Sequence, residues 1–196
     1  MNTFLIVAVS LDGFIGKDQA DLSTRWTSKE DFVWFSRRTK QARFCVMGRK
    51  TYETFNRPLP DRITIIQTRS PLAWQRKQVG LGVQVRLVDK QTDIAHLKNQ
   101  GTTQVWVTSL EISELYQLLV DANTSELAVC GGSSIYTQWF LSGFVNELYL
   151  TVEPVIFGAG VKLFNQLVNV GLEIIEEKKL NNKGTRLIRL RAKIEK

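Results

Sequence analysis

One acidic residue, Asp31, lies in a sequence neighbourhood that favours a proton donor. It follows Ser28, a residue type that caps helix N-termini, in a segment whose pattern predicts a helix from Lys29 to Lys40. Phe32 and Phe35 share a helical face beside Asp31, so the carboxyl group would border an aromatic surface. Desolvation there raises a carboxyl pKa toward neutrality, which suits general acid chemistry. A structural interpretation stays open, because an acid at this position can also reach back to cap the helix.

Three further segments end an apolar run with groups that bind phosphate. They are Met47-Gly-Arg-Lys-Thr51, Ile65-Ile-Gln-Thr-Arg-Ser70 and Ala128-Val-Cys-Gly-Gly-Ser-Ser134. Helix N-termini offer unpaired N–H groups to anions, and open α/β sheets bind ligands beyond the carboxyl ends of their strands. Each segment alone is also compatible with an ordinary strand-to-helix turn. Their joint occurrence favours a site for a phosphorylated ligand.

Several other chemistries find no support in the sequence. The only histidine, His96, has no partner at metal-ligand spacing, so we expect no metal site, and no GxSxG elbow is present. Cys45 and Cys130 are embedded in apolar runs, where free cysteine behaves as a small hydrophobe, which favours a reducing cytoplasm. The apolar runs fall far short of the roughly 20 residues that a transmembrane helix needs. We therefore expect no membrane partner.

The formal net charge of +7 suits an anionic partner, either a nucleic acid or a phosphorylated small molecule. Much of the excess lies after residue 177, where cations alternate with Leu and Ile as on the solvated face of a strand. No nucleic-acid-binding motif accompanies them. We expect a small-molecule substrate and no nucleic acid, and keep a basic nucleic-acid-binding protein as the alternative from another class.

Apolar runs that alternate with helical patterns would position these residues. The runs predict buried strands at Phe4–Val9, Phe44–Met47, Ile63–Ile66, Val105–Val107 and Leu127–Cys130. Helical patterns lie between several of them, at Lys29–Lys40, Lys50–Phe55, Glu111–Ala122 and Ser133–Leu141. Alternation of this kind implies right-handed crossovers and a mostly parallel central sheet with helices on both faces.

The end of the chain changes to strand patterns separated by turns. They cover Val145–Val152, Leu172–Leu180 and Thr185–Ile194, with one short helical segment at 161–167. Asn181-Asn-Lys-Gly184 is a strong hairpin signal. We therefore predict a single-domain three-layer α/β/α fold over residues 1–196, with an antiparallel edge hairpin at the C-terminus and an insertion around residues 74–104. The last strand is compatible with a free edge or a dimer seam, so the oligomeric state stays open.

Taken in order, the motifs resemble the dihydrofolate reductase family and its structural relative, the reductase domain of riboflavin biosynthesis. The matching segments are Ser10-Leu-Asp-Gly-Phe-Ile-Gly16, Trp26 with Asp31, Met47-Gly-Arg-Lys-Thr-Tyr-Glu53, Arg57-Pro-Leu-Pro-Asp-Arg62, Gly131-Gly132 with Tyr136, and Leu148-Tyr-Leu-Thr151. The resemblance implies a dihydrofolate reductase-like fold and NADPH as the cofactor. It further implies reduction of 7,8-dihydrofolate to tetrahydrofolate by hydride transfer, a reaction of one-carbon metabolism.

The resemblance also implies a role for each matching residue. Asp31 would be the active-site acid, Thr151 its hydroxyl partner, and Trp26 would fix the nearby water and loop. The substrate cleft would be lined by Ile6, Val7, Phe32, Phe35, Phe55 and Leu59, with Arg62 on a carboxylate of the folate tail. The cofactor would be held by Ala8, Ile15, Gly48, Arg49, Lys50, Thr51, Thr68, Arg69, Ser70, Gly131, Gly132, Ser133, Ser134, Ile135 and Tyr136, and Gly131-Gly132 would be the family's cis glycine pair.

Three segments depart from the dihydrofolate reductase pattern. The loop from Gly16 to Trp26 is longer than usual, and residues 74–104 form the insertion. The segment from Glu153 to Phe164 resembles the riboflavin reductase domain more than the folate enzyme. The alternative substrate is therefore a phosphoribosyl-aminopyrimidine of riboflavin biosynthesis, although the deaminase half of the bifunctional riboflavin enzyme has no counterpart here.

Overall fold

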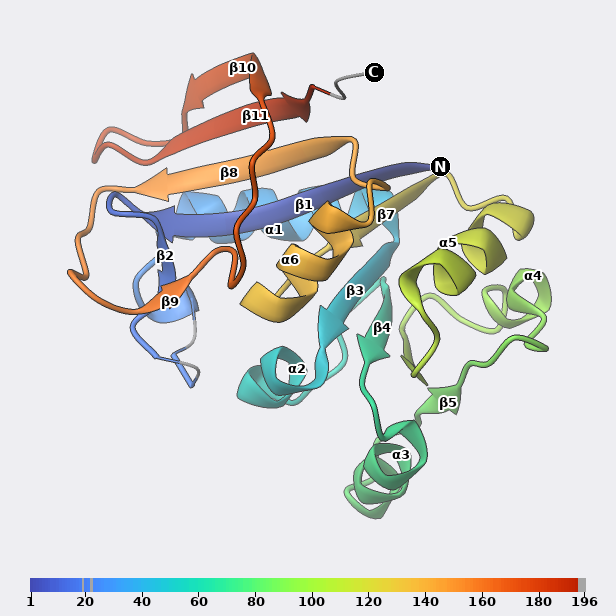
Figure 1. Ribbon diagram of the computed structural model, residues 1–196. Coiled ribbons are helices and arrows are strands. Elements are labelled where there is room, and N and C mark those ends of the chain that lie inside the picture. Colours follow the sequence, from blue (N-terminus) through green and yellow to red (C-terminus); the bar gives the residue numbers. More distant parts are fainter. Residues whose placement is uncertain (19, 22, 194–196) are drawn as a thin grey trace.

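A single large sheet organises the molecule (Figure 1). The computed structural model describes residues 1–18, 20, 21 and 23–193. Its nine-stranded sheet has the order β10-β11-β8-β1-β7-β3-β4-β6-β5. The strands are β1 (Asn2–Ser10), β3 (Phe44–Gly48), β4 (Ile63–Gln67), β5 (Arg86–Leu87), β6 (Gln104–Thr108), β7 (Glu126–Val129), β8 (Glu147–Glu153), β10 (Leu172–Lys179) and β11 (Arg186–Ala192).

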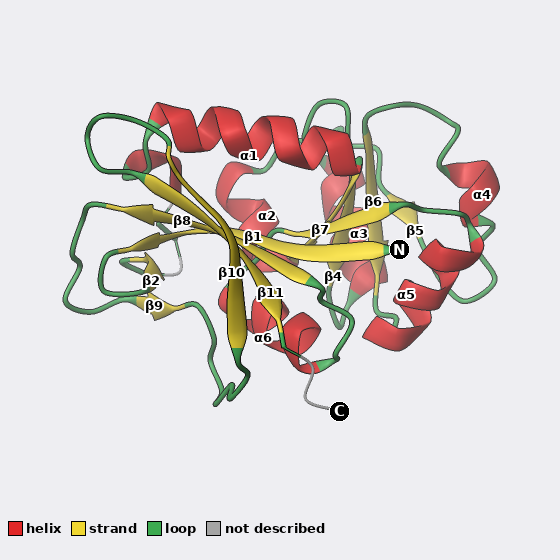
Figure 2. Ribbon diagram, turned by 90° about the horizontal axis from the view of Figure 1, so that it is seen from above, coloured by secondary structure: helices red, strands yellow, loops and turns green. Residues whose placement is uncertain are grey.

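Helices cover both faces of this sheet, as the sequence predicts (Figure 2). One apolar cluster joins the sheet to α4, α5 and α6, and a second joins its other face to α1, α2 and α3. The alternation of side chains along each buried strand produces the two clusters, since Leu5 lies in the first and Phe4 in the second. The helices are α1 (Lys29–Ala42), α2 (Arg49–Phe55), α3 (Pro71–Gly80), α4 (Ile94–Leu97), α5 (Ile112–Asp121) and α6 (Ser133–Leu141), with a 3-10 turn at Ser23–Arg25.

Strand directions confirm the predicted mixed sheet. Every neighbouring pair from β8 to β5 in the strand order runs parallel, whereas β11 runs antiparallel to β8 and β10 antiparallel to β11. The predicted turn at 181–184 joins β10 to β11, and Gly184 takes the positive φ of 104° that such turns require. Ile194, the predicted end of the last strand, lies outside the described residues.

Two segments differ from the simple sequence pattern. The short helix predicted at 161–167 is wrong: Val161–Lys162 forms β9, which pairs with β2 (Phe14–Gly16) in a separate small sheet. This pairing brings Gly160 so close to the Gly16 carbonyl that a side chain there would collide with it.

The segment 74–104, predicted as an insertion, contributes most of α3 together with β5 and α4, and β5 extends the sheet beside β6. None of the described helices is long and apolar enough to cross a bilayer.

An ion pair between the buried Arg38 and the partly exposed Glu126 fastens α1 to the sheet. The Arg38 guanidinium donates two hydrogen bonds of 2.8 Å to Glu126 at the start of β7 and lies 3.9 Å from the ring centroid of Phe4. A bidentate pair of this kind is stronger and more directional than a single contact. It therefore sets the position of the helix that carries Asp31.

Loss of this pair should destabilise the protein. Arg38→Met leaves Glu126 without its cation, and we expect the free energy of unfolding to fall by about 2 kcal/mol, given that Glu126 is partly exposed. Urea denaturation measures the change. The control is Arg186→Met, which breaks the exposed pair with Glu177 and should change stability by no more than about 0.5 kcal/mol. Equal effects of the two substitutions would contradict a special role for Arg38.

Candidate active site

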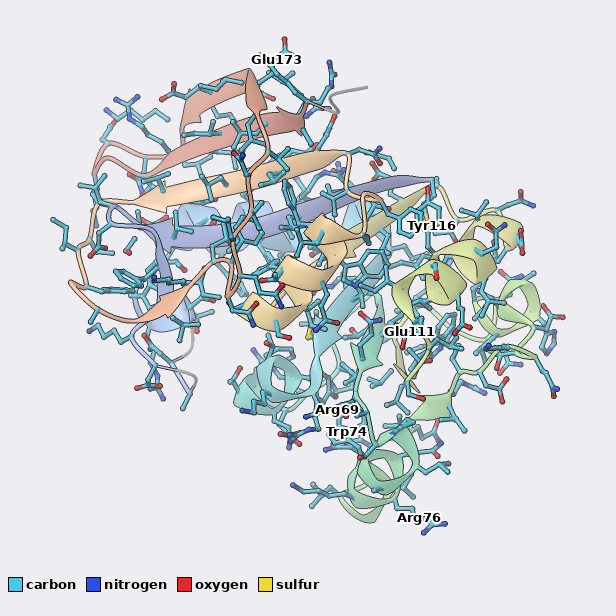
Figure 3. All side chains as sticks on the ribbon, in the orientation of Figure 1. Arg69, Trp74, Arg76, Glu111, Tyr116 and Glu173 are labelled. Atoms are coloured by element: carbon cyan, nitrogen blue, oxygen red, sulfur yellow. The ribbon has the colours of Figure 1, made fainter. Side chains whose placement is uncertain are left out.

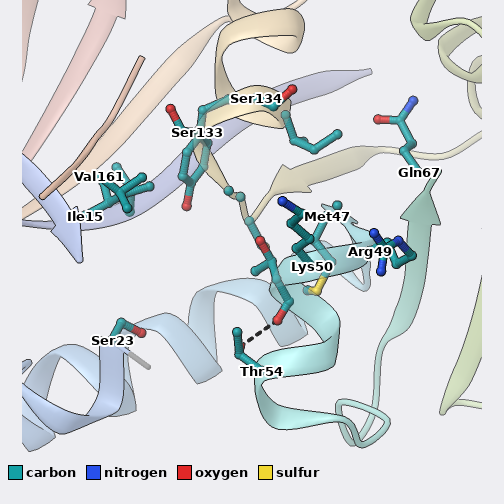
Figure 4. Close-up of a pocket in the computed structure, with 18 of the residues that line it drawn as sticks. Ile15, Ser23, Met47, Arg49, Lys50, Thr54, Gln67, Ser133, Ser134 and Val161 are labelled. Atoms are coloured by element: carbon teal, nitrogen blue, oxygen red, sulfur yellow. Dashed lines mark hydrogen bonds between the residues drawn. The ribbon is translucent and has the colours of Figure 1, made fainter. Parts of the chain in front are cut away.

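A pocket of about 1470 Å³ lies along the carboxyl ends of the parallel strands. Its floor includes Ile6, Val7 and Ala8 of β1, and its rim follows the ends of β3, β4, β6 and β7. This is the position that open α/β sheets use for ligands. Figure 4 shows part of the lining, with Ser133 and Ser134 at the start of α6 and Arg49 and Lys50 at the start of α2.

Most residues predicted for the site do line this pocket. On the substrate side they are Asp31, Ile6, Val7, Phe32, Phe35, Phe55 and Leu59. On the cofactor side they are Ala8, Ile15, Gly48, Arg49, Lys50, Thr51, Thr68, Arg69, Gly131, Gly132, Ser133, Ser134, Ile135 and Tyr136. The Gly131-Gly132 peptide is cis, as predicted. The pocket therefore brings together segments that are far apart in the sequence.

Asp31 is a buried acid at the apolar side of the pocket. Only 8% of its surface is exposed, and burial raises the pKa of its carboxyl group to about 6. Hydrogen bonds with Thr151 and Thr27 act against this rise in pKa, whereas the negative charge of Glu153 adds to it. The capping role falls to Ser28, whose hydroxyl accepts the Asp31 backbone N–H at 3.2 Å. The Asp31 side chain therefore remains free to face β8 and the pocket.

Thr151 lies on β8, where it pairs with Ala8 of β1 in the sheet register. It is 2% exposed and does not itself line the pocket. Its hydroxyl bonds the Asp31 carboxyl group, so it reaches the pocket only through that group. The predicted pairing of these two residues agrees with this geometry.

Besides Thr151, three predicted residues lie outside the pocket lining. Arg62 is only 4% exposed and donates to Pro60 O at 3.0 Å and to Thr39 Oγ1 at 2.8 Å, so it faces the interior rather than a folate carboxylate. Trp26 packs edge-to-face on Phe157, with ring centroids 5.1 Å apart, and borders a separate small hollow. Ser70, the residue before α3, lies outside the lining. In these cases packing against other elements decides where the side chain points, and the sequence motif does not contain that information.

The cofactor side is rich in groups that suit a dinucleotide. Ser133 Oγ, at the N-terminus of α6, is buried without a hydrogen-bond partner among the described residues. A Cβ at Gly132 would lie 3.0 Å from Thr51 Oγ1, and one at Gly48 would lie 3.1 Å from Ile135. These glycines therefore let two strand ends approach closely beside unpaired helix N–H groups. An unsatisfied hydroxyl at a helix N-terminus is what a phosphate oxygen would satisfy.

Glu53 links the predicted insertion to the basic side of the pocket. Its Oε2 accepts a 2.7 Å hydrogen bond from Arg49, and its Oε1 accepts one of 3.1 Å from the indole of Trp74. Trp74 is buried in α3 against Tyr52. Figure 3 labels Trp74 in α3 and Arg69 in the segment that precedes this helix. The α3 segment thereby restrains the guanidinium of Arg49.

The sequence interpretation missed part of the lining. Gln67 at the end of β4 and Thr108 at the end of β6 follow the same strand-end rule that identified Thr68 and Gly131, and could have been found by it. Arg57, Val161 and Lys162 had no such signal, because they reach the pocket from loops and from the small β2–β9 sheet. Glu153, which lies outside the lining but whose charge acts on Asp31, also had no signal in the sequence.

Comparison with known proteins identifies the family. A family model described as dihydrofolate reductase matches residues 2–107, somewhat more than half of the chain. The chain belongs to the dihydrofolate reductase family. The dihydrofolate reductase of Buchnera aphidicola is 31% identical over 159 residues, which cover 81% of this chain and 75% of that protein. The uncharacterized protein YwjB of Bacillus subtilis is 27% identical over 192 residues, covering 94% and 90%.

Solved structures of this family and its relatives share the fold. A pyrimidine reductase-like protein of Corynebacterium diphtheriae has a TM-score of 0.73 at 15% identity, covering 99% of this chain and 92% of that one. Dihydrofolate reductase of Enterococcus faecalis, in a complex with NADP(H), has a TM-score of 0.64 at 21% identity, covering 97% and 96%. Family membership makes this chain an NADPH-dependent oxidoreductase.

Burial of Asp31 should cost stability at neutral pH. Its pKa rises from 3.8 to about 6 on folding, so the folded protein binds the proton more tightly, and the cost grows as the pH rises from about 4 through 6. Asp31→Asn should therefore stabilise the protein at pH 8 by up to about 3 kcal/mol and have little effect near pH 4. Urea denaturation at both pH values measures this.

Asp61→Asn is the matched control. Asp61 is exposed and pairs with Lys40, which lowers the pKa of its carboxyl group, so its replacement should not stabilise the protein at pH 8. A gain for Asp31→Asn that is equal at pH 4 and pH 8 would show that desolvation of the charge is not its cause.

Proposed function

We propose that this protein reduces 7,8-dihydrofolate to tetrahydrofolate with NADPH. The observation that carries the proposal is the buried Asp31 carboxyl group, with its pKa near 6, at the mouth of an aromatic cleft that opens onto a phosphate-binding rim. A flat heterocycle with an amino group beside a ring nitrogen offers two hydrogen-bonding atoms to such a carboxyl group. The relatives named dihydrofolate reductase add support from sequence.

In this proposal the residues around the cleft bind the pterin, position the acid and limit the access of water. Asp31 binds the amino group and ring nitrogen of the pterin and favours protonation of the imine that is reduced. Thr151 holds the Asp31 carboxyl group in place. Phe32, Phe35 and Leu59 flank the ring and limit the access of water, which keeps the pKa of the acid above its usual value. Trp26 packs on Phe157 outside the pocket lining, and its indole N–H, which is buried without a hydrogen-bond partner among the described residues, would hold a water and the loop near the acid.

The cofactor, when bound, supplies the hydride. Ser133 and Ser134 with the first N–H groups of α6 would hold the pyrophosphate, and Ala8 and Ile15 would flank the nicotinamide. Arg49 and Arg69 would bind the 2′-phosphate, since guanidinium groups suit bidentate phosphate recognition. Lys50 and Thr51 would complete this basic end.

A phosphoribosyl-aminopyrimidine is the alternative substrate. It is favoured by the inward orientation of Arg62, which removes the expected partner of a folate carboxylate. Val161 and Lys162 bring a cation to the pocket from the segment that resembles the riboflavin reductase domain. The pyrimidine reductase-like structural relative agrees with this alternative at the level of fold.

Purified protein should oxidise NADPH rapidly with one of the two substrates. We expect turnover with 7,8-dihydrofolate and tight binding of methotrexate; turnover with the ribosyl-aminopyrimidine alone, without methotrexate binding, would replace the first proposal by the second. Asp31→Asn should lower turnover by about 10² or more. Because the protonated acid is the active form, the rate should fall as the pH rises through about 6.

Cofactor preference can be tested at Arg49. Arg49→Ala should weaken NADPH binding by about 10- to 100-fold, as expected for one charge-assisted contact, and leave NADH binding nearly unchanged. Isothermal titration calorimetry with both cofactors measures this. Arg76→Ala is the control, because Arg76 projects from the far side of α3 in Figure 3 and lies outside the pocket lining. Equal losses for both cofactors would argue against a 2′-phosphate contact.

A further inference from the structure

Glu153 is a buried carboxylate that no step described so far uses. It ends β8, has 3% of its surface exposed and lies outside the pocket lining. Its Oε1 accepts the backbone N–H of Ser28 at 2.7 Å, and its Oε2 accepts the hydroxyl of Thr185 at 2.7 Å. Both donors are neutral groups. A carboxylate taken out of water onto two neutral donors is costly, so its presence requires an explanation.

The two contacts join the start of α1 to the C-terminal hairpin. Ser28 is the residue that caps α1 by accepting the N–H of Asp31. Thr185 belongs to the β10–β11 turn, where Asn181 Nδ2 donates to its hydroxyl at 2.9 Å and to Glu30 Oε2 at 3.1 Å. Glu153 is thus the central member of a network that crosses from the hairpin turn to the first turn of the helix.

The same strand supplies a second contact to Asp31. Side chains two residues apart on a strand share a face, so Thr151 and Glu153 point toward α1 together. Thr151 bonds the Asp31 carboxyl group directly, whereas Glu153 holds the residue that caps its helix. The end of β8 therefore fixes Asp31 from two directions.

We propose that Glu153 is a positioning residue for Asp31: it fixes the first turn of α1 against the β10–β11 turn and places a second negative charge beside the acid. This inference rests on the proposed function, because it assigns Glu153 a task in the chemistry of Asp31.

The second charge gives Glu153 an electrostatic effect as well as a geometric one. A like charge nearby disfavours ionisation of Asp31 and so adds to the effect of burial on its pKa. Other ionisable groups around this pair are Glu30 on α1, the buried Tyr136 on α6, and Lys29 and Lys183, whose charges act on Glu30. Glu30 binds the neutral Asn181 amide. Of these groups, Glu153 is the buried carboxylate whose charge raises the pKa of Asp31.

Glu153→Gln separates charge from shape. The amide oxygen can still accept from Ser28, and its NH₂ group can donate to the Thr185 hydroxyl, so the network keeps its connections. The titration of the Asp31 carboxyl carbon, followed by ¹³C NMR and assigned with Asp31→Asn, should move to lower pH by about one unit. The midpoint of the pH–rate profile should move with it. Glu173→Gln, the same change at the exposed start of β10, is the control and should move neither.

Three outcomes distinguish the inference from the proposed function. An Asp31 titration in Glu153→Gln that overlays the wild-type curve would overturn the inference. If that variant fails to fold, Thr185→Val serves instead: it removes the hydrogen bond that ties Glu153 to the β10–β11 turn. The first turn of α1 is then held less firmly, so Asp31 should be less buried and its titration should move to lower pH; an unchanged curve would again overturn the inference. A shifted titration in a protein that reduces neither substrate would reject the proposed function alone.

Discussion

Burial of one carboxyl group is the constraint on which the active site depends. Asp31 can hold a proton near pH 6 only because α1 presents it to an aromatic cleft instead of water. That arrangement costs stability, and the surroundings offset the cost through specific contacts. Ser28 satisfies the helix N-terminus, Thr151 bonds the side chain, and Arg38 fastens the same helix to β7 farther along. Each of these contacts joins α1 to another element of the fold.

The cofactor side depends on a different property of the same sheet. Parallel strands end at one edge, so polar residues that follow β3, β4, β6 and β7 gather without any long-range sequence signal. Close approach of these ends requires glycine at Gly48 and Gly132, where a side chain would press on Ile135 or Thr51. Apolar burial therefore characterises the end of the pocket beside Asp31, and backbone proximity with cationic side chains characterises the end at the starts of α2 and α6.

Sequence reasoning succeeded where one local rule determined the outcome. Strand-end placement located Thr68, Arg69 and Gly131, and helical spacing put Phe32 and Phe35 beside Asp31. It failed where side-chain direction depended on packing from another element. Arg62 follows the family motif, yet its guanidinium donates a hydrogen bond to Thr39 of α1 in the interior. Glu153 escaped notice because its partners, Ser28 and Thr185, become neighbours only after β8, α1 and the hairpin have assembled.

The interior position of Arg62 also bears on substrate choice. The Arg62 guanidinium is bound to Pro60 and Thr39, whereas two exposed cations, Arg57 after α2 and Lys162 in β9, do line the pocket. Exposed cations tolerate different anionic groups more readily than a fixed, buried arginine, because their side chains can reorient. The reacting end, in contrast, is rigid, since Asp31 is held through α1 and β8. Asp31 is thus held by two elements of the fold, whereas the exposed cations that line the pocket can reorient.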